Sequence, residues 1–245
     1  MKFIAPAAAA LIAANVPCIT AYTYDGTKIG YGQGTVVDNR NRPVDAAEFN
    51  SRYGDLDACA LSHDDKRIII TFDQGYENGY TEKILDTLKE KNVTAIFFLT
   101  GDYAKKEKAL VNRMIDEGHI IGNHGMTHAS LPDLSESEAK EEIMSLHNYV
   151  LDEYDYEMSF FRCPCGEYSE AALAEIQDCG YSTVFWSFAY VDWITDKQPA
   201  LDEGLTKISQ SAHGGEILLL HSVSSTNAEI LGDVIDNFRA QGFIV

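Results

Sequence analysis

The hydrophobic positions of the chain change their pattern near residue 67. From there, short apolar runs alternate with stretches in which apolar residues recur at helical spacing, a pattern typical of repeated βαβ units. The apolar runs predict strands over residues 68–72, 94–99, 119–124, 158–162, 182–187, 216–221 and 243–245. Parallel strands connected by outer helices predict an α/β fold, and the number of runs predicts a seven-stranded β/α barrel, closed or incomplete.

Specific residues mark helix boundaries between these runs. Thr81 begins the amphipathic stretch TEKILDTLKEKN, and Gly118 ends the stretch KKEKALVNRMIDEG. Ser135 and Glu138 form a capping box ahead of AKEEIMSLHNYVLDEY, because each side chain can accept a hydrogen bond from the backbone N–H of the other residue. We therefore expect helices at these places.

The chain before residue 67 divides into two segments. Residues 1–21 contain one Lys, an Ala-rich apolar stretch and small residues near Ala21, which predicts an export signal peptide. The apolar stretch is too short for a comfortable membrane span, and an ordinary N-terminal apolar segment is the alternative interpretation. Residues 22–66 are rich in Gly, Asp, Asn and Tyr without sustained periodicity, so they predict an irregular extension with room for a short hairpin. Residues 67–245 then form the main domain.

Composition and net charge limit the kinds of molecule that the protein is expected to bind. The chain has 245 residues, 45% of them hydrophobic, and a formal net charge of −19. This length and apolar content suffice for one α/β domain, and the negative charge argues against a nucleic-acid or anionic-membrane surface. The cysteine spacings predict no disulfide framework, and the single C-x-C at Cys163 and Cys165 is weak evidence for a metal site.

Polar and aromatic residues collect directly after the predicted strands. In a β/α barrel these positions meet at the C-terminal rim, where active sites lie. The residues concerned, taken strand by strand, are Asp73, Gln74, His124, Arg162, Trp186, Asp192, Trp193 and His221.

The sequence HGMTH suggests a metal site at this rim. His124 and His128 are four residues apart, so two imidazoles can reach one ion from a helical turn or a tight loop. Two packed or surface histidines are the alternative. Their place after a strand end, opposite Asp73, favours the metal site.

His221 ends the apolar run ILLLH, where an imidazole needs a polar partner. Asp192 is a candidate for that partner and would raise the protonated fraction of His221, which suits a general acid. Arg162 has a simpler candidate role, because its fixed cation can hold Asp73 ionised and oriented. A structural histidine–aspartate pair and an ordinary strand-end salt bridge are the respective alternatives.

Five motifs together resemble a known family. TFDQG, HGMTH, RCPCG, VDW and LLLH occur in the order and approximate spacing of the motifs of the polysaccharide deacetylases, carbohydrate esterase family four. The longer phrases TFDQGYENGYTEKILDTLKEKNVTAIFFLTG, DEGHIIGNH and TVFWSFAYVDW are most similar to the delta-lactam-biosynthetic subgroup, which de-N-acetylates spore-cortex peptidoglycan. The resemblance covers about residues 50–245 and implies that residues 67–245 are the catalytic domain, with the family's distorted seven-stranded β/α barrel.

The resemblance also implies roles for individual residues. Asp73 would be the general base, oriented by Arg162, and His221 the general acid, paired with Asp192. His124 and His128 would bind a divalent ion, most naturally zinc. Trp193 and Leu219 would form walls of the pocket for the acetyl methyl group, and a backbone N–H near Cys165 would hold the oxyanion.

Some positions depart from the family pattern. Gln74 stands where most members have a second Asp, and the delta-lactam subgroup is similar to this chain in often lacking that Asp. A glutamine oxygen can ligate a divalent ion but brings no charge, so we expect weak metal binding with Gln74 as a poor ligand. Gly125 replaces a usual Ser or Thr, and Ala129 replaces a usual Pro.

The implied reaction is hydrolytic N-deacetylation of 2-acetamido sugars in peptidoglycan, with N-acetylmuramic acid favoured and acetate released. Other acylated polysaccharides, such as chitin oligomers or acetylxylan, are alternative substrates, and a non-catalytic glycan-binding relative is a further alternative. The implied partner is thus a glycan rather than nucleic acid. We expect a secreted or cell-envelope protein with no stable membrane span after signal removal.

Overall fold

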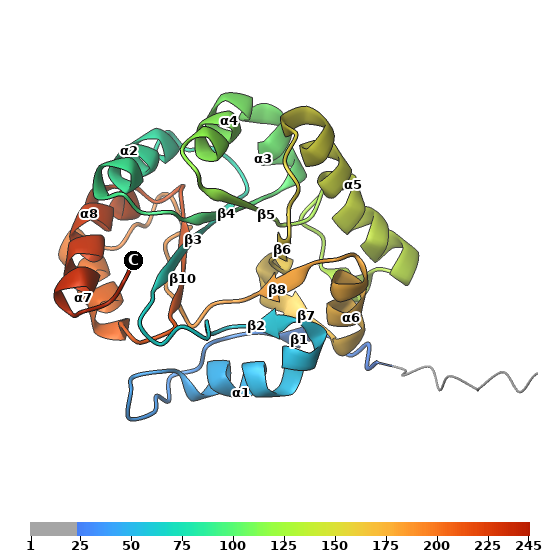
Figure 1. Ribbon diagram of the computed structural model, residues 1–245, viewed down its shortest axis with the longest axis horizontal. Helices are drawn as coiled ribbons and strands as arrows, with labels where there is room; N and C mark the ends of the chain where they lie inside the picture. Colours follow the sequence, from blue (N-terminus) through green and yellow to red (C-terminus); the bar gives the residue numbers. More distant parts are fainter. Residues whose placement is uncertain (1–23) are drawn as a thin grey trace, which may run out of the picture.

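The computed structural model describes residues 24–245, so the predicted signal peptide over residues 1–21 lies outside the described residues. In the described part of the chain, eight parallel strands form one curled sheet in the order β2-β8-β6-β5-β4-β3-β10-β9, an incomplete barrel (Figure 1). Their bounds are β2 Ala58–Cys59, β3 Ile69–Gln74, β4 Ile96–Leu99, β5 Ile120–Asn123, β6 Phe160–Phe161, β8 Ser182–Val184, β9 Phe188–Ala189 and β10 Ile217–His221. A separate antiparallel pair joins β1 (Ile29–Gly30) to β7 (Glu167–Tyr168). The predicted distorted α/β barrel is therefore confirmed.

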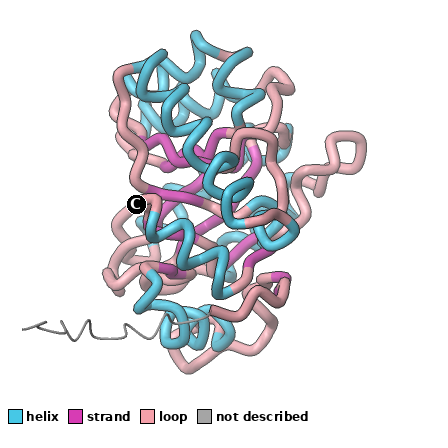
Figure 2. The backbone as a smooth tube through the Cα atoms, turned by 90° about the vertical axis from the view of Figure 1, so that its right-hand side faces the viewer, coloured by secondary structure: helices cyan, strands magenta, loops and turns pink. Residues whose placement is uncertain are grey.

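Helices cover the outside of this sheet, and Figure 2 shows the strands in the middle of the molecule with helices around them. The helices are α1 Val44–Tyr53, α2 Thr81–Lys91, α3 Gly101–Lys106, α4 Lys108–Asp116, α5 Glu136–Tyr154, α6 Glu170–Asp178, α7 Leu201–Ser211 and α8 Ser225–Ala240. Three short 3₁₀ turns also occur in the described residues, η1 Gly54–Leu56, η2 Leu131–Asp133 and η3 Pro164–Gly166. Within residues 24–245, no helix has both the length and the apolar character to cross a membrane.

The apolar residues of the strands divide between the two faces of the sheet. Ile96 and Phe98 of β4 belong to a small cluster to which six further strands, β2, β3, β5, β6, β8 and β10, each contribute, so this cluster is the barrel interior. Phe97 and Leu99, the alternate residues, pack with the helices in the larger core. This alternation is the period of two that a pleated strand imposes. Alternate residues of each strand therefore face the barrel interior, and the last of these inward-facing residues lies at the C-terminal rim.

The predicted helix boundaries are confirmed, because Thr81 begins α2 and Gly118 (φ 80°) follows the end of α4, but one predicted helix is not continuous. Asn92 in the left-handed region ends α2, and the capping box of Ser135 and Glu138 begins α5. The stretch KKEKALVNRMIDEG was predicted as one helix, but the chain bends at Glu107 (φ −104°, ψ 42°), which divides it between α3 and α4.

The predicted count of seven strands is wrong in the described residues. Residues 243–245 form no strand, because only Ile244 pairs with Arg67, just before β3 begins. Strands β2 and β9 were not expected, and each is two residues long.

The segment predicted as irregular, residues 22–66, also contains regular structure. Ala46, Phe49 and Tyr53 recur at helical spacing in α1 and are buried in the core, and β2 then adds an edge strand beside β8. The polar residues between them hid this short amphipathic pattern.

Candidate active site

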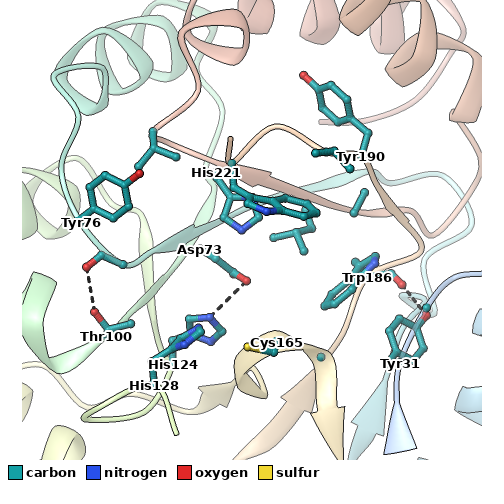
Figure 3. A pocket seen from close by; sticks show the side chains of 18 of the residues that line it. Tyr31, Asp73, Tyr76, Thr100, His124, His128, Cys165, Trp186, Tyr190 and His221 are labelled. Atoms are coloured by element: carbon teal, nitrogen blue, oxygen red, sulfur yellow. Dashed lines mark hydrogen bonds and ion pairs between the residues drawn. The ribbon is translucent and has the colours of Figure 1, made fainter. Parts of the chain in front are cut away.

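A pocket of about 900 Å³ opens at the C-terminal ends of the barrel strands. Figure 3 shows Asp73 between His221 and His124 in this pocket, with Cys165 and Trp186 on another side. Asp73 ends the inward series of β3, and His221 ends that of β10. The rim position follows from the strand alternation and matches the place of active sites in β/α barrels.

A buried guanidinium fixes the carboxylate of Asp73. Arg162 is fully buried, and its Nη1 donates to Asp73 Oδ1 at 2.9 Å and to Thr71 Oγ1 at 2.8 Å. The guanidinium also lies 4.1 Å from the centre of the Phe98 ring, which holds it in place. Burial alone would raise the pKa of Asp73, but the charge and hydrogen bond of Arg162, together with the nearby His124 and His221, hold that pKa below the usual range. Asp73 is therefore an ionised, oriented carboxylate.

Beside it lie two neutral imidazoles. His124 Nδ1 lies 2.8 Å from the Arg162 carbonyl oxygen, which can only accept, so Nδ1 carries the proton and Nε2 has a free lone pair. His124 Nε2 lies 3.5 Å from Asp73 Oδ2, and the ring centres of His124 and His128 are 4.8 Å apart. Burial lowers the pKa of His124 to about 4 and also lowers that of His128. Both rings are therefore available as nitrogen donors.

This donor set suits a divalent ion in its chemistry. Neutral imidazoles and a carboxylate oxygen are ordinary zinc ligands, and a ring N–H that donates to a carbonyl is the usual second partner of a ligating histidine. Among residues 24–245, however, no three His, Cys, Asp or Glu side chains are already arranged as a metal site. The fit therefore rests on the pair His124 and His128.

Gln74, the doubtful ligand, is buried beside this region but does not line the pocket. Its amide nitrogen donates to Ser222 Oγ, whereas its amide oxygen is buried without a hydrogen-bond partner among the described residues. A buried oxygen without a partner is costly unless an ion or water satisfies it.

Across the pocket, His221 is paired with a buried carboxylate. Asp192 Oδ1 accepts from His221 Nδ1 at 2.7 Å, and its Oδ2 accepts from the His221 backbone N–H at 2.8 Å and from Asn227 Nδ2 at 2.6 Å. Burial lowers the pKa of His221, but the hydrogen bond and charge of Asp192 outweigh burial, so that this pKa is raised overall. The free Nε2 of a protonated His221 can then donate into the pocket.

The base and acid candidates come from adjacent strands. His221 and Asp73 are register partners between β10 and β3, and neighbouring strands lie about 4.8 Å apart. The structure thus brings Asp73, His221 and the two imidazoles to one end of the barrel, with Arg162 and Asp192 buried behind them.

The two predicted wall residues, Trp193 and Leu219, and the predicted oxyanion residue, Cys165, also line the pocket. The Trp193 ring centre lies 5.4 Å from that of His221, and about half of the Trp193 surface is exposed. Leu219 is buried in β10 two residues before His221. Cys165 has a left-handed backbone (φ 58°), which a non-glycine residue adopts only at a cost of about 1–3 kcal/mol.

Sequence reasoning missed a wall that comes from the N-terminal extension. Tyr31 donates to the Trp186 carbonyl at 2.6 Å, and Gln33 accepts from Trp186 Nε1 at 2.8 Å, so the extension holds Trp186 against the pocket. Gln33 also donates to the Ala189 carbonyl at 3.0 Å. The sequence GYGQGT signals only turns, so nothing in its pattern could have assigned these contacts.

Comparison with known proteins agrees with this architecture. Residues 60–184 match the family model for polysaccharide deacetylase. The peptidoglycan-N-acetylmuramic acid deacetylase PdaA of Bacillus subtilis is 41% identical over 206 residues, 83% of this chain and 78% of that protein. A peptidoglycan-N-acetylglucosamine deacetylase of Bacillus cereus is 33% identical over 174 residues, 71% of this chain and 62% of that protein.

Solved structures are similar over a larger share of the chain. Bacillus subtilis PdaA, a family 4 carbohydrate esterase, superposes with a TM-score of 0.84 at 39% identity, covering 90% of this chain and 94% of that one. A family 4 carbohydrate esterase from Bacillus anthracis superposes with a TM-score of 0.74 at 37% identity, covering 91% and 94%.

A carboxylate and a histidine on two sides of a pocket, beside an imidazole pair, have the chemistry that the base and the acid of a hydrolase require. The chain belongs to the polysaccharide deacetylase family, whose members in family 4 of the carbohydrate esterases are hydrolases.

Proposed function

We propose that this protein removes the acetyl group from 2-acetamido sugars of peptidoglycan, with N-acetylmuramic acid favoured, and releases acetate. The observation that carries the proposal is the pairing of Asp73 and His221 on adjacent strand ends, across one pocket. The similarity to the peptidoglycan-N-acetylmuramic acid deacetylase of Bacillus subtilis supports the choice of sugar.

In the proposed reaction, the acetamide lies between the two strand ends. Asp73, kept ionised by Arg162, accepts a proton from the attacking water. His221, kept protonated by Asp192, donates a proton to the departing amine, which is otherwise a poor leaving group. The products are acetate and the free amino sugar, so the atoms of one water are divided between them.

Enzymes of this family depend in general on a metal ion, and we propose zinc held by His124 and His128. When bound, the ion would supply a Lewis acid that polarises the acetamide oxygen and lowers the pKa of a nearby water. The neutral state of both imidazoles favours this binding, because a protonated ring has no lone pair to offer.

The remaining pocket residues have proposed binding roles. Trp193 and Leu219 offer apolar contact to the acetyl methyl group. The backbone N–H at Cys165 is the proposed oxyanion donor, and the left-handed conformation there supports a site that holds a donor in a fixed direction.

Acetate release tests the proposal. Purified peptidoglycan, chitin oligomers and acetylxylan are offered with and without zinc, and the muropeptides are analysed by mass spectrometry. We expect loss of acetyl from the muramic acid of peptidoglycan, and its absence from Asp73→Asn but not from the exposed control Asp116→Asn. Preferential release from either other polymer would change the substrate. Equal release by the unchanged protein and Asp73→Asn would remove Asp73 from the reaction.

This substrate lies in the cell envelope, so we propose action outside the cytoplasm, with residues 1–21 as the export signal. Detection of the protein in a culture supernatant or envelope fraction, with its N-terminus cleaved near Ala21, tests this placement.

A further inference from the structure

The loop that carries His124 and His128 needs support from outside itself. It follows β5 and reverses through two left-handed residues, Gly125 (φ 83°) and His128 (φ 64°). The two imidazoles therefore project from a tight loop rather than from a helix, so helical hydrogen bonds do not set their separation.

Glu142 of α5 supplies this support. Its side chain is buried, with 7% of its surface exposed. Oε1 accepts from the backbone N–H of Thr127 at 2.6 Å and of Ala129 at 3.2 Å, and Oε2 accepts from Thr127 Oγ1 at 2.9 Å. Its backbone carbonyl accepts from the Met126 N–H at 3.1 Å. One residue of α5 thus holds Met126, Thr127 and Ala129 around His128, the latter two through charge-assisted bonds to its carboxylate.

The residues at the two ends of this loop, Gly125 and Ala129, accommodate the Glu142 carboxylate. A Cβ at Gly125 would lie 2.8 Å from Glu142 Oε1, in a backbone conformation that L side chains rarely adopt. Ala129 contributes an N–H that a proline lacks. The two departures from the usual family pattern noted in the sequence, Gly125 and Ala129, are therefore both explained by Glu142.

We infer that Glu142 is a positioning residue that sets the separation and orientation of the His124 and His128 rings. The inference rests on the proposed function in one respect, namely that His124 and His128 hold the metal ion. Loss of the carboxylate leaves the N–H groups of Thr127 and Ala129 without acceptors, so the loop relaxes and the two nitrogen donors move apart. Outer partners of this kind contribute about 10–100-fold to metal affinity.

The test compares Glu142→Gln with Glu141→Gln, an exposed glutamate one residue earlier in the same helix. A glutamine offers one acceptor oxygen where the carboxylate offers two, and its NH₂ would face N–H donors. We expect zinc affinity, measured by titration calorimetry, to fall at least about tenfold in Glu142→Gln and to stay unchanged in Glu141→Gln. Hydrogen exchange at the amides of Thr127 and Ala129 should accelerate only in Glu142→Gln.

Other results would overturn the inference. If exchange accelerates while zinc affinity stays at the Glu141→Gln value, Glu142 stabilises the loop but positions neither ring. Unchanged exchange would show that the carboxylate does not hold the loop. Should Glu142→Gln fail to fold, Thr127→Val removes only the Oγ1 bond and must weaken zinc binding by a smaller factor. Neither readout needs a substrate, so the absence of acetate release by the unchanged protein would refute the proposed function alone.

Discussion

Two histidine–carboxylate pairs lie at opposite ends of β10 and have opposite electrostatic character. At the rim, His221 Nδ1 donates to Asp192, and the pKa of His221 is raised although burial opposes it. At the other end, His213 Nδ1 lies 3.4 Å from Glu216 Oε2, but burial lowers the pKa of His213 and raises that of Glu216 to about 8. The pair of His221 and Asp192 favours a protonated histidine beside a carboxylate. The pair of His213 and Glu216 favours a neutral histidine beside a neutral carboxyl group.

The two pairs differ in the hydrogen bonds that their carboxyl groups accept. Asp192 receives three hydrogen bonds of 2.6–2.8 Å, which compensate its buried charge. Glu216 receives only two longer bonds, from the His213 N–H at 3.2 Å and Ser211 Oγ at 3.4 Å. His213 instead donates Nδ1–H to the Ser211 carbonyl at 2.6 Å. Proximity of a histidine to a carboxylate therefore does not create an ion pair unless the carboxylate is also satisfied.

The strongest test of this contrast replaces each histidine with asparagine. His221→Asn should lower kcat by about a thousandfold, because it removes the proton donor for the amine. His213→Asn should leave kcat nearly unchanged and lower the free energy of unfolding by about 1–3 kcal/mol, because the Ser211 carbonyl and Ser187 hydroxyl lose a buried partner. Acetate-release kinetics and urea denaturation measure the two effects. Similar loss of kcat in both folded variants would contradict the division of roles.

A second substitution tests the contribution of the Asp192 carboxylate at the rim. Asp192→Asn should lower kcat/KM by about a hundredfold near neutral pH, since the proton on His221 is no longer stabilised. His221 acts in its protonated form, so a lower pKa moves the alkaline limb of the pH–rate profile to lower pH. Asp196→Asn, an exposed aspartate of the same loop, is the control and should leave the profile unchanged. An unshifted alkaline limb in Asp192→Asn would separate Asp192 from the acid.

Sequence reasoning reached the rim pair but not the pair at the other end of β10. The run ILLLH marks His221 because a histidine that ends a buried strand needs a partner. Asp192 is the candidate from its place after another predicted strand, and the motif VDW implies the same pairing by resemblance. His213 and Glu216 stand in a glycine-containing turn, where the sequence does not reveal burial.

Local sequence patterns do not show how distant segments pack, and this limit explains the other features that were not predicted. Strand ends could be placed from apolar runs, because alternation is a local property of the chain. Glu142 and the contacts of Tyr31 and Gln33 depend on how distant segments pack, which no local pattern encodes. The bend at Glu107 interrupts a stretch with good helical periodicity, so tertiary packing overrode propensity there.

The neutral pair should be visible in the pH dependence of stability. Burial raises the pKa of Glu216 from 4.5 to about 8, so the native state holds an extra proton between these two pH values. Its stabilising contribution is fully present below pH 4.5 and is lost as pH rises through 8. Between pH 6 and 8 the unchanged protein should lose about 2 kcal/mol relative to Glu216→Gln, which keeps the contribution of His213.

Urea denaturation at several pH values measures this loss, with the exposed Glu48→Gln as the control. The control should follow the unchanged protein throughout. Parallel curves for the unchanged protein and Glu216→Gln would mean that Glu216 is already ionised in the native state.

The smallest predicted effect asks whether a new carboxylate at the buried position 74 behaves like Asp192 or like Glu216. Gln74→Asp places a carboxylate in a fully buried position whose present amide oxygen has no partner among the described residues. Without an ion the new carboxylate should lower the free energy of unfolding, as an unsatisfied buried charge does. If residue 74 reaches the ion held by His124 and His128, zinc should bind at least about tenfold more tightly, about 1.4 kcal/mol.

A zinc titration of both proteins at one pH measures this difference, because both imidazoles must be unprotonated to bind. Gln210→Asp, the same substitution at an exposed position of α7, should bind zinc as the unchanged protein does. Equal affinity in Gln74→Asp and Gln210→Asp would mean that residue 74 is not a ligand. The oxygen at position 74 would then resemble Glu216, buried beside a polar neighbour that does not satisfy it, and metal binding would depend on the two histidines and on the loop that Glu142 holds.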